Sequence, residues 1–181
     1  RLASDAPVTI TASIGWSELA AGHDTPESAL REAELAMYSA KAAGRDQVCR
    51  FEPEMLAELA QRDGLVHDLR DAIAQGAMAL NLQAQVDRYG RVLGAEALLR
   101  WTRRGVAISP TVFIPVAEES GLILPLGDWV LQRACELLVA WSSRPATQSL
   151  TLAINVSARQ FAQPHFVDGV CQALAATGAD P

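Results

Sequence analysis

In the first part of the chain, the spacing of the apolar positions changes from that of a strand to that of a helix. Residues 8–15, VTITASIG, alternate and are rich in β-branched side chains, which predicts a strand that ends at a glycine turn. Thr25 and Pro26 have the order of a helix N-cap followed by proline at the first helical position. The apolar positions that follow keep helical spacing until Gly44, so the pattern predicts a strand, a loop and a long helix.

A second helix is predicted from Met55 to Gln75, because its leucines keep helical spacing. Arg62, Asp63 and Gly64 combine charge with a glycine, and they predict a break within this helix. We place a domain boundary at the break. Residues 1–52 then form a first region, residues 53–64 a linker helix and residues 65–181 a second region.

Beyond Gly76 the apolar residues recur at every second position, which is the period of a strand. Met78 to Ala84 and Val92 to Trp101 therefore read as two strands, and Tyr89-Gly90 marks the turn of a hairpin. The remaining pattern predicts a helix at 109–119, a helix at 126–141, a strand at 150–156, and a further helix with Ser157 and Gln160 as its capping box. Strands alternating with such helices indicate a parallel α/β architecture, either an open doubly wound sheet or a barrel.

The strand at 92–101 places Glu96, Leu98 and Arg100 on one face by its two-residue period. A carboxylate among apolar neighbours needs a partner, and the candidates are an ion pair or a metal ion. Residues four apart on a strand have Cα atoms about 13 Å apart, which is too far for easy direct pairing. This favours separate partners for Glu96 and Arg100.

Asn155 stands at the end of the strand at 150–156. Taken alone, it is typical of a turn residue or a local cap. Together with Glu96 it forms a pair of hard oxygen ligands suited to Mg²⁺ or Mn²⁺, and no cysteine or histidine lies near them in sequence to indicate zinc. If the barrel interpretation is right, we expect the two side chains to lie near one another at the ends of adjacent strands, with Arg100 close by.

Composition narrows the classes of partner. The net charge of −6 and the pI near 5.0 argue against broad binding of nucleic acid or anionic lipid. The three cysteines show no pairing or metal-binding spacing, which fits a reducing cytoplasm. No apolar run approaches the roughly 20 residues that span a bilayer, and the first residues do not resemble a signal peptide.

We expect the three histidines to lie at the surface, namely His23, His67 and His165. We expect Trp129 and Trp141 to have packing roles.

Four ordered segments of the second region resemble the EAL domain family of bacterial cyclic di-GMP signalling proteins. They are LNLQAQV at 80–86, EALLRW at 96–101, the run from Phe113 to Gly121 preceded by Pro110, and NVS at 155–157. The tripeptide alone is common by chance, but four segments in this order and spacing are not. The resemblance covers about residues 65–181.

The family that the second region resembles is a modified TIM barrel with an antiparallel first strand. Its members hydrolyse cyclic di-GMP to linear pGpG with divalent metals, so the resemblance implies Mg²⁺ or Mn²⁺ as cofactor. It implies Glu96 and Asn155 as metal ligands, Arg100 as a phosphate contact, and Gln83 and Leu98 as further substrate-binding residues. Arginine offers charge-assisted donors to phosphate, and metal ions stabilise charge on phosphoryl oxygens.

The sequence departs from the family pattern in two ways. Leu82 and Ala84 replace the tyrosine and proline of the first-strand motif, which alters base packing without removing a metal ligand. The later family segments are absent, namely the glutamate of the fourth strand, the paired aspartates, the lysine and the catalytic glutamate. We interpret both chain ends as cuts. We therefore expect about three barrel strands, no visible general base and an inactive fragment.

The first region resembles the end of a GGDEF diguanylate cyclase domain. ASIG at 12–15 matches its late strand, and AELAMY at 33–38 with Lys41 and Arg45 matches the helix that follows, although Glu34 replaces the usual aspartate. The family uses this lysine and arginine on nucleotide phosphates. By chemistry alone, both residues also suit the negative end of a helix dipole. The GGDEF loop would precede Arg1, so the visible segment leaves cyclase activity open.

The leading hypothesis is a parent protein that hydrolyses cyclic di-GMP and carries an adjoining GGDEF module, which either is catalytic or binds GTP as a regulator. The rival is a non-catalytic cyclic di-GMP receptor, or a protein-interaction module with a degenerate EAL site. Glu96, Arg100 and Asn155 favour the enzyme, because a receptor has less need of a metal pair. We expect a cytoplasmic homodimer that does not bind nucleic acid. The presence of a membrane anchor in an upstream region of the parent protein is left open.

Overall fold

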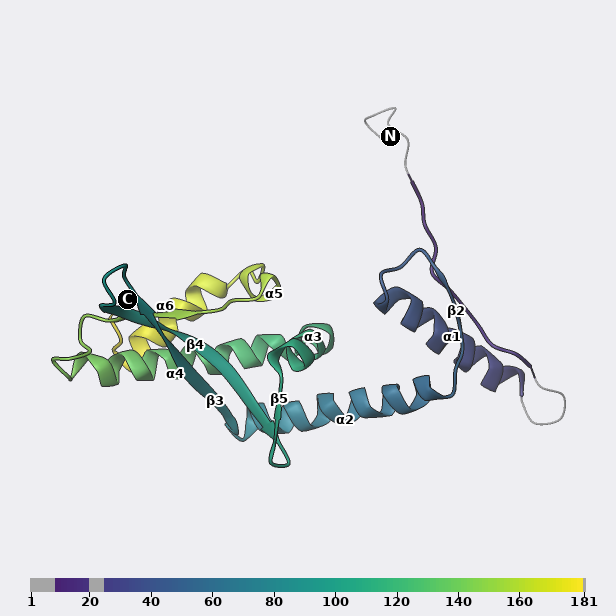
Figure 1. The fold of residues 1–181 in the computed structure, drawn as a ribbon, viewed down its shortest axis with the longest axis horizontal. Coiled ribbons are helices and arrows are strands. Elements are labelled where there is room, and N and C mark those ends of the chain that lie inside the picture. Colours follow the sequence, from purple (N-terminus) through teal and green to yellow (C-terminus); the bar gives the residue numbers. More distant parts are fainter. Residues whose placement is uncertain (1–8, 20–24, 181) are drawn as a thin grey trace. The chain divides into compact units, whose positions relative to one another are not determined.

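The structure is a computed structural model that describes residues 9–19 and 25–180. The chain divides into two compact units, Arg1–Asp63 and Gly64–Pro181 (Figure 1). Within the described ranges, no helix is both long enough and apolar enough to cross a membrane.

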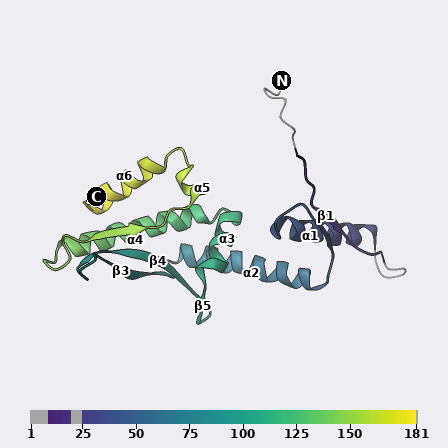
Figure 2. The same ribbon diagram turned by 45° about the horizontal axis from the view of Figure 1, so that its top comes forward.

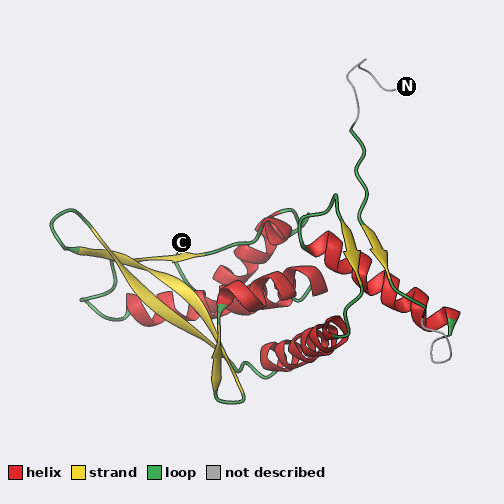
Figure 3. Cartoon of the chain, turned by 45° about the vertical axis from the view of Figure 1, so that its right-hand side comes forward, coloured by secondary structure: helices red, strands yellow, loops and turns green. Residues whose placement is uncertain are grey.

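The first unit contains a short parallel sheet with one helix between its strands. β1 (Ile14–Trp16) pairs in parallel with β2 (Val48–Arg50), and α1 (Pro26–Ala42) connects them (Figure 3). The helix begins where the sequence predicts it. Thr25 Oγ1 accepts a hydrogen bond from the Ser28 N–H at 3.2 Å, and the Thr25 N–H donates to Ser28 Oγ at 3.0 Å. This reciprocal cap fixes the first turn of α1.

The strand predicted at 8–15 is shorter than expected. Only Ile14 to Trp16 pairs, residues 9–13 are not part of a strand, and Val8 lies outside the described residues. The reason is the partner, β2, which is three residues long and therefore supports only a short ladder. The sequence analysis missed β2, because three residues are too few to show a periodic pattern.

The break predicted within the second helix is wrong. α2 is one helix, Glu54–Ala74, and it passes Arg62, Asp63 and Gly64 without interruption. An isolated glycine costs a helix only about 1 kcal/mol relative to alanine, and the burial of Leu69 and Ala72 further along offsets such a cost. The division between the two units nevertheless falls at these residues.

The second unit is built on a four-stranded sheet with β4 at its centre. β3 (Met78–Val86) and β4 (Val92–Arg103) form the predicted antiparallel hairpin. The other edge of β4 is shared by two strands. β6 (Thr151–Ile154) pairs in parallel with Gly94–Ala97, and β5 (Val106–Ile108) pairs antiparallel with Trp101–Arg103. The architecture is therefore mixed α/β.

Two later helices, α3 (Pro110–Ser120) and α4 (Ile123–Ser142), cover the apolar face of this sheet together with the end of α2 (Figure 2). The remaining helices, α5 (Ala158–Phe161) and α6 (Phe166–Thr177), pack against α4. Phe113 of α3 and Leu126 of α4 are fully buried against Trp101 of β4, whose ring meets that of Phe113 edge to face at 5.6 Å. Trp129 packs against the same core, as expected.

Two elements of this unit were not anticipated, and one strand is shorter than predicted. β5 and α6 lay outside the sequence predictions, and the strand predicted at 150–156 pairs only over Thr151–Ile154. β5 is three residues in a tight hairpin with β4, and its turn contains Arg104 and Gly105 at positive φ. Such a hairpin has too few residues to show strand periodicity. The antiparallel first strand matches the expected barrel topology, while barrel closure stays a prediction.

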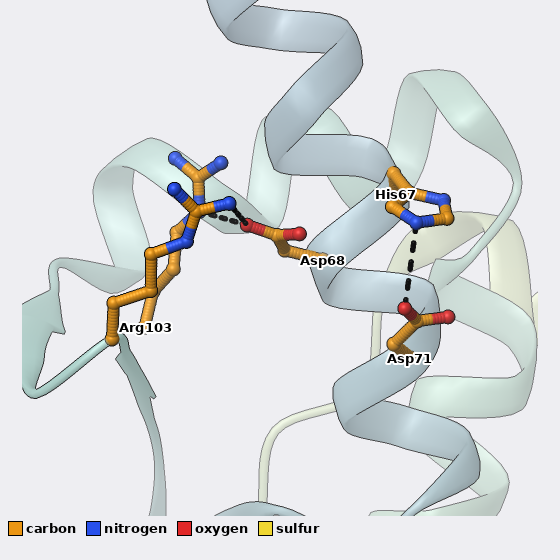
Figure 4. Close-up of polar contacts among 5 residues, drawn as sticks. His67, Asp68, Asp71 and Arg103 are labelled. Carbon is orange, nitrogen blue, oxygen red and sulfur yellow. Dashed lines mark hydrogen bonds and ion pairs between the residues drawn. The ribbon is translucent and has the colours of Figure 1, made fainter.

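An ion pair fixes α2 to the end of β4. Asp68 on α2 points toward Arg103, whose Nε lies 2.5 Å from Asp68 Oδ2, and Arg104 Nη2 lies 3.5 Å from the same oxygen (Figure 4). The hydrogen bond from Arg103 holds the pKa of Asp68 below its ordinary value of 3.8, and partial burial opposes this effect. The charges of Arg103, Arg104 and His67 also favour the ionised carboxylate.

We predict that Asp68→Asn lowers the thermal stability of the protein at neutral pH. Because folding lowers the pKa of Asp68, its stabilising contribution is complete above pH 3.8 and is lost as the pH falls toward the lowered pKa. The difference in Tm between the variant and the wild type should therefore shrink in acid. Asp71→Asn is the matched control, since Asp71 faces His67 at 3.5 Å in an exposed pair on the same helix. Equal effects of the two substitutions would contradict the assignment.

Candidate functional site

One face of the sheet carries the polar side chains that the sequence analysis singled out. Gln83 of β3 lies directly opposite Glu96 of β4, so the two side chains share a face. Leu98 and Arg100 follow on that face at the two-residue period of the strand. Glu96, Leu98 and Arg100 are half-buried and Gln83 is exposed. No polar or charged residue is fully buried in the described part of the chain, so Glu96 is better hydrated than the sequence argument assumed.

Glu96 and Asn155 are in direct contact. Asn155 directly follows β6, and its Nδ2 donates a hydrogen bond to Glu96 Oε1 at 2.7 Å. The contact follows from the register, because Ala153 of β6 pairs with Glu96 and Asn155 lies two residues further on, on the same face. The structure thus brings together the two residues that we expected to be adjacent. A half-turn of the Asn155 amide would present Oδ1 in place of Nδ2.

The close approach of β6 to β4 depends on Gly94. A methyl group at this position would lie 2.3 Å from the Thr151 carbonyl oxygen and 2.4 Å from Thr151 Oγ1. The carbonyl belongs to the backbone of β6, so it has no freedom to move aside without separating the strands. Gly94 was not singled out from the sequence, because its role depends on a strand far away in the chain.

Arg100 lies beside a cavity that Asn155 also lines. Its Nη1 donates to the Leu99 carbonyl oxygen at 2.9 Å, and it forms no ion pair with Glu96 within the described residues. The cavity has a volume of about 360 Å³ and opens where Leu98, Leu99 and Arg100 have no strand partner on the second edge of β4. Asn155 and Arg100 both line this cavity, whereas Glu96 and Gln83 do not.

The turn after Asn155 is held by α5. Ser157 Oγ accepts from the Gln160 N–H at 3.1 Å, and Gln160 Oε1 accepts from the Ser157 N–H at 3.2 Å, which confirms the predicted capping box. Arg159 adds a hydrogen bond from Nη1 to the Glu118 carbonyl oxygen near the end of α3. The sequence analysis did not identify Arg159, because a bond to a backbone carbonyl leaves no recognisable motif.

In the first unit, Lys41 and Arg45 occupy different kinds of position. Lys41 is in the last turn of α1, and its ammonium lies 5.4 Å from the centre of the Tyr38 ring. Arg45 lies beyond the end of the helix at Ala42, with a positive φ of 63°. The two residues are therefore not neighbours on one helical surface, although their spacing of four suggested this.

The remaining candidates behave largely as expected. His67 and His165 are exposed, and His23 lies outside the described residues. The three cysteines are free. Among the described residues, no group of three or more His, Cys, Asp or Glu side chains is arranged to hold a metal ion, so the Glu96 and Asn155 pair has no further such ligand there.

Comparison with known proteins identifies the second unit. Residues 66–181 match the EAL domain family over well more than half of the chain. The chain belongs to the EAL domain family. The EAL domain thus contains the sheet with Glu96 and Asn155, together with α3 to α6.

Relatives of this EAL domain include cyclic di-GMP enzymes. The chain is 38% identical over 177 residues to the bifunctional diguanylate cyclase/cyclic di-GMP phosphodiesterase MucR of Pseudomonas aeruginosa, covering 96% of this chain and 26% of MucR. It is 38% identical over 147 residues to the cyclic di-GMP phosphodiesterase PdeR of Escherichia coli, covering 80% of this chain and 22% of PdeR. The chain thus spans about a quarter of the length of these relatives.

A solved structure shows the same fold. The PaMucR phosphodiesterase in complex with c-di-GMP superposes with a TM-score of 0.61 at 38% sequence identity, over 65% of this chain and 48% of that one. The mixed α/β arrangement of the second unit is therefore that of an EAL domain.

We predict that Gly94→Ala destabilises this EAL domain by about 1–3 kcal/mol, the usual cost of forcing extra volume into a tight contact. The reason is the backbone of Thr151, which leaves no space for a methyl group. Chemical denaturation measures the free energy of unfolding. Gly169→Ala on α6 is the control, since a methyl group there would meet nothing within 4 Å. An unchanged stability of the Gly94 variant would show that β6 is not held as closely as described.

Proposed function

We propose that the whole protein hydrolyses cyclic di-GMP to linear pGpG with Mg²⁺ or Mn²⁺ bound at its EAL domain. The observation that carries this proposal is the contact between Glu96 and Asn155 at one edge of the polar sheet face. MucR and PdeR support it, because both are named as cyclic di-GMP phosphodiesterases and both align with most of this chain.

Glu96 and Asn155 suit a hard divalent cation. Mg²⁺ accepts carboxylate and amide oxygens at about 2.1 Å, and two ligands at right angles around it are about 3 Å apart. The distance of 2.7 Å between Asn155 Nδ2 and Glu96 Oε1 is close to that spacing, so a half-turn of the amide would give two oxygens with a suitable separation. When bound, such an ion stabilises charge on the phosphoryl oxygens and activates water.

The other residues of the polar face would hold the substrate. Arg100 lies on the polar face of β4 and has further N–H donors besides the Nη1 bonded to Leu99, so we assign it to a substrate phosphate. Leu98 lines the cavity beside Asn155 and offers an apolar contact. Gln83, opposite Glu96, offers an amide to a guanine edge.

Residues 1–181 by themselves should not catalyse the reaction. The described residues supply only this pair of oxygen donors and no cluster of three acidic, histidine or cysteine ligands. Further ligands and a general base would have to complete the site. We therefore assign metal binding and substrate positioning to these residues, and not proton transfer.

A second function is favoured by the hydrogen bond itself. Asn155 donates to Glu96 Oε1, so the two side chains can pair directly with one another. An EAL domain in this state would bind cyclic di-GMP through Arg100 and Gln83 without cleaving it. The whole protein would then be a cyclic di-GMP receptor.

For the first unit we propose the end of a GGDEF domain. The resemblance at 12–15 overlaps the start of β1, and that at 33–45 runs from α1 into the loop after it. The alignment with bifunctional MucR covers 96% of this chain. Lys41 and Arg45 would contact phosphates of GTP, with Arg45 presented by the loop after α1 and Lys41 by its last turn.

We predict that Glu96→Ala in the whole protein lowers kcat by more than about a hundredfold, because the loss of a directly bound ligand exceeds the typical cost of an outer-shell change. Arg100→Ala should instead raise KM by about tenfold to a hundredfold, the value of a charge-assisted hydrogen bond. Steady-state hydrolysis of cyclic di-GMP with Mg²⁺ or Mn²⁺ separates the two effects. Glu136→Ala, an exposed glutamate on α4, serves as the control.

Two outcomes would overturn the enzymatic proposal. Full activity of the Glu96 variant would show that the carboxylate is dispensable. Tight binding of cyclic di-GMP by the wild type in EDTA, with no turnover after Mg²⁺ or Mn²⁺ is added, would establish the receptor instead.

We also predict that Lys41→Ala and Arg45→Ala each weaken GTP binding by about tenfold or more, as expected for the loss of a charged hydrogen bond to phosphate. Fluorescent GTP titration of the whole protein measures this change. Arg31→Ala removes the same charge from the exposed first half of α1 and should leave binding unchanged. If all three variants bind GTP alike, the phosphate assignment is wrong.

A further inference from the structure

Gly127 on α4 lies directly against the side chain of Gln160. A methyl group at Gly127 would be 1.5 Å from Gln160 Nε2 and 2.4 Å from its Cδ. The carboxamide of Gln160 therefore occupies the space that any side chain at position 127 would need. Gln160 is a flexible side chain, so a methyl group there would displace the carboxamide and would not have to break α4 itself.

The carboxamide of Gln160 also takes part in the capping of α5. Gln160 Oε1 accepts the hydrogen bond of the Ser157 N–H at 3.2 Å, and this bond is half of the capping box of α5. Ser157 is two residues after Asn155. The conformation of the chain just beyond Asn155 thus depends on where the Gln160 amide is held.

Asn155 has little other support. It lies outside the ladder of β6, whose last paired residue is Ile154. α5 has only four residues, none of them buried, and helices much shorter than about 12 residues are not stable on their own. Its contacts with neighbouring helices therefore fix its place, through Arg159 on the Glu118 carbonyl oxygen and Gln160 against Gly127.

Lack of space, and not backbone conformation, disfavours alanine at Gly127. Gly127 lies in the interior of α4, and its φ is not positive, so alanine would fit its backbone. Gly169 in α6 offers the comparison, since a methyl group there would meet nothing within 4 Å. The difference between the two positions is the Gln160 side chain.

We propose that Gly127 and Gln160 are positioning residues for Asn155. Gly127 leaves the space, Gln160 fills it and caps α5, and the cap holds Asn155 against Glu96. The inference rests on the proposed function, in which Asn155 and Glu96 share a divalent cation.

The test is the affinity of the whole protein for Mn²⁺ without cyclic di-GMP, measured from the electron paramagnetic resonance signal of the free ion. Gly127→Ala and Gln160→Ala should each weaken Mn²⁺ binding by about tenfold or more, as is typical when the support of a metal ligand is removed. Gln160→Glu should bind Mn²⁺ nearly as the wild type does, since glutamate at this position of a capping box also accepts from the cap N–H. Gly169→Ala should leave the affinity unchanged.

The double variant Gly127→Ala with Gln160→Ala gives a stricter test of the proposal. Because each substitution removes the same amide from the same place, the double variant should bind Mn²⁺ no more weakly than Gln160→Ala alone. If Gly127→Ala does not fold, the contrast between Gln160→Ala and Gln160→Glu carries the test.

The failures of the two proposals are distinguishable. Wild-type Mn²⁺ affinity in Gln160→Ala, together with lost binding in Glu96→Ala, overturns the positioning role and leaves the proposed function standing. A lowered Tm with unchanged Mn²⁺ affinity has the same meaning, because it reveals a purely structural contact. Wild-type Mn²⁺ affinity in Glu96→Ala overturns both proposals.

Discussion

The alternation of β4 sets the face on which Glu96, Leu98 and Arg100 lie. Ala95, Ala97 and Trp101 point into the core, so the residues between them must point to the other face. Trp101 is only 2% exposed and meets Phe113 edge to face, which fixes the strand against its helices. A shift of one residue would expose this ring and bury Glu96, so the energy of the core also determines the register of the polar face.

Features that depend on neighbours in the sequence were predicted well. The starts of α1, α3 and α5 were recognised from Thr25, Ser109 and Ser157, because a cap is formed by residues within a single turn. The hairpin of β3 and β4 was recognised for the same reason. β2 and β5 were missed and the break in α2 was wrong, since three-residue strands and a tolerated Gly64 depend on partners elsewhere in the fold.

In the candidate site, too, the local features were predictable from the sequence and the long-range contacts were less so. The shared face of Glu96, Leu98 and Arg100 follows from strand periodicity alone. The contact of Asn155 with Glu96 depends on the pairing of β4 with β6, and chemistry suggested it. The bond from Arg100 to the Leu99 carbonyl oxygen is local to β4 and was not expected. Gly94 and Gly127 carried no signal, because a glycine that makes room for a distant group has the same appearance in a sequence as a glycine in a turn.

The sequence separation of 59 between Glu96 and Asn155 has a consequence for folding kinetics. The β3–β4 hairpin closes a short loop and can form early, which places Gln83 opposite Glu96 before the rest of the domain is ordered. The β4–β6 pairing must wait until α3 and α4 have spanned the intervening chain, at a larger loss of loop entropy. Asn155 is therefore expected to reach its place beside Glu96 later than Gln83 does, because its contact depends on this long-range pairing and not on the hairpin.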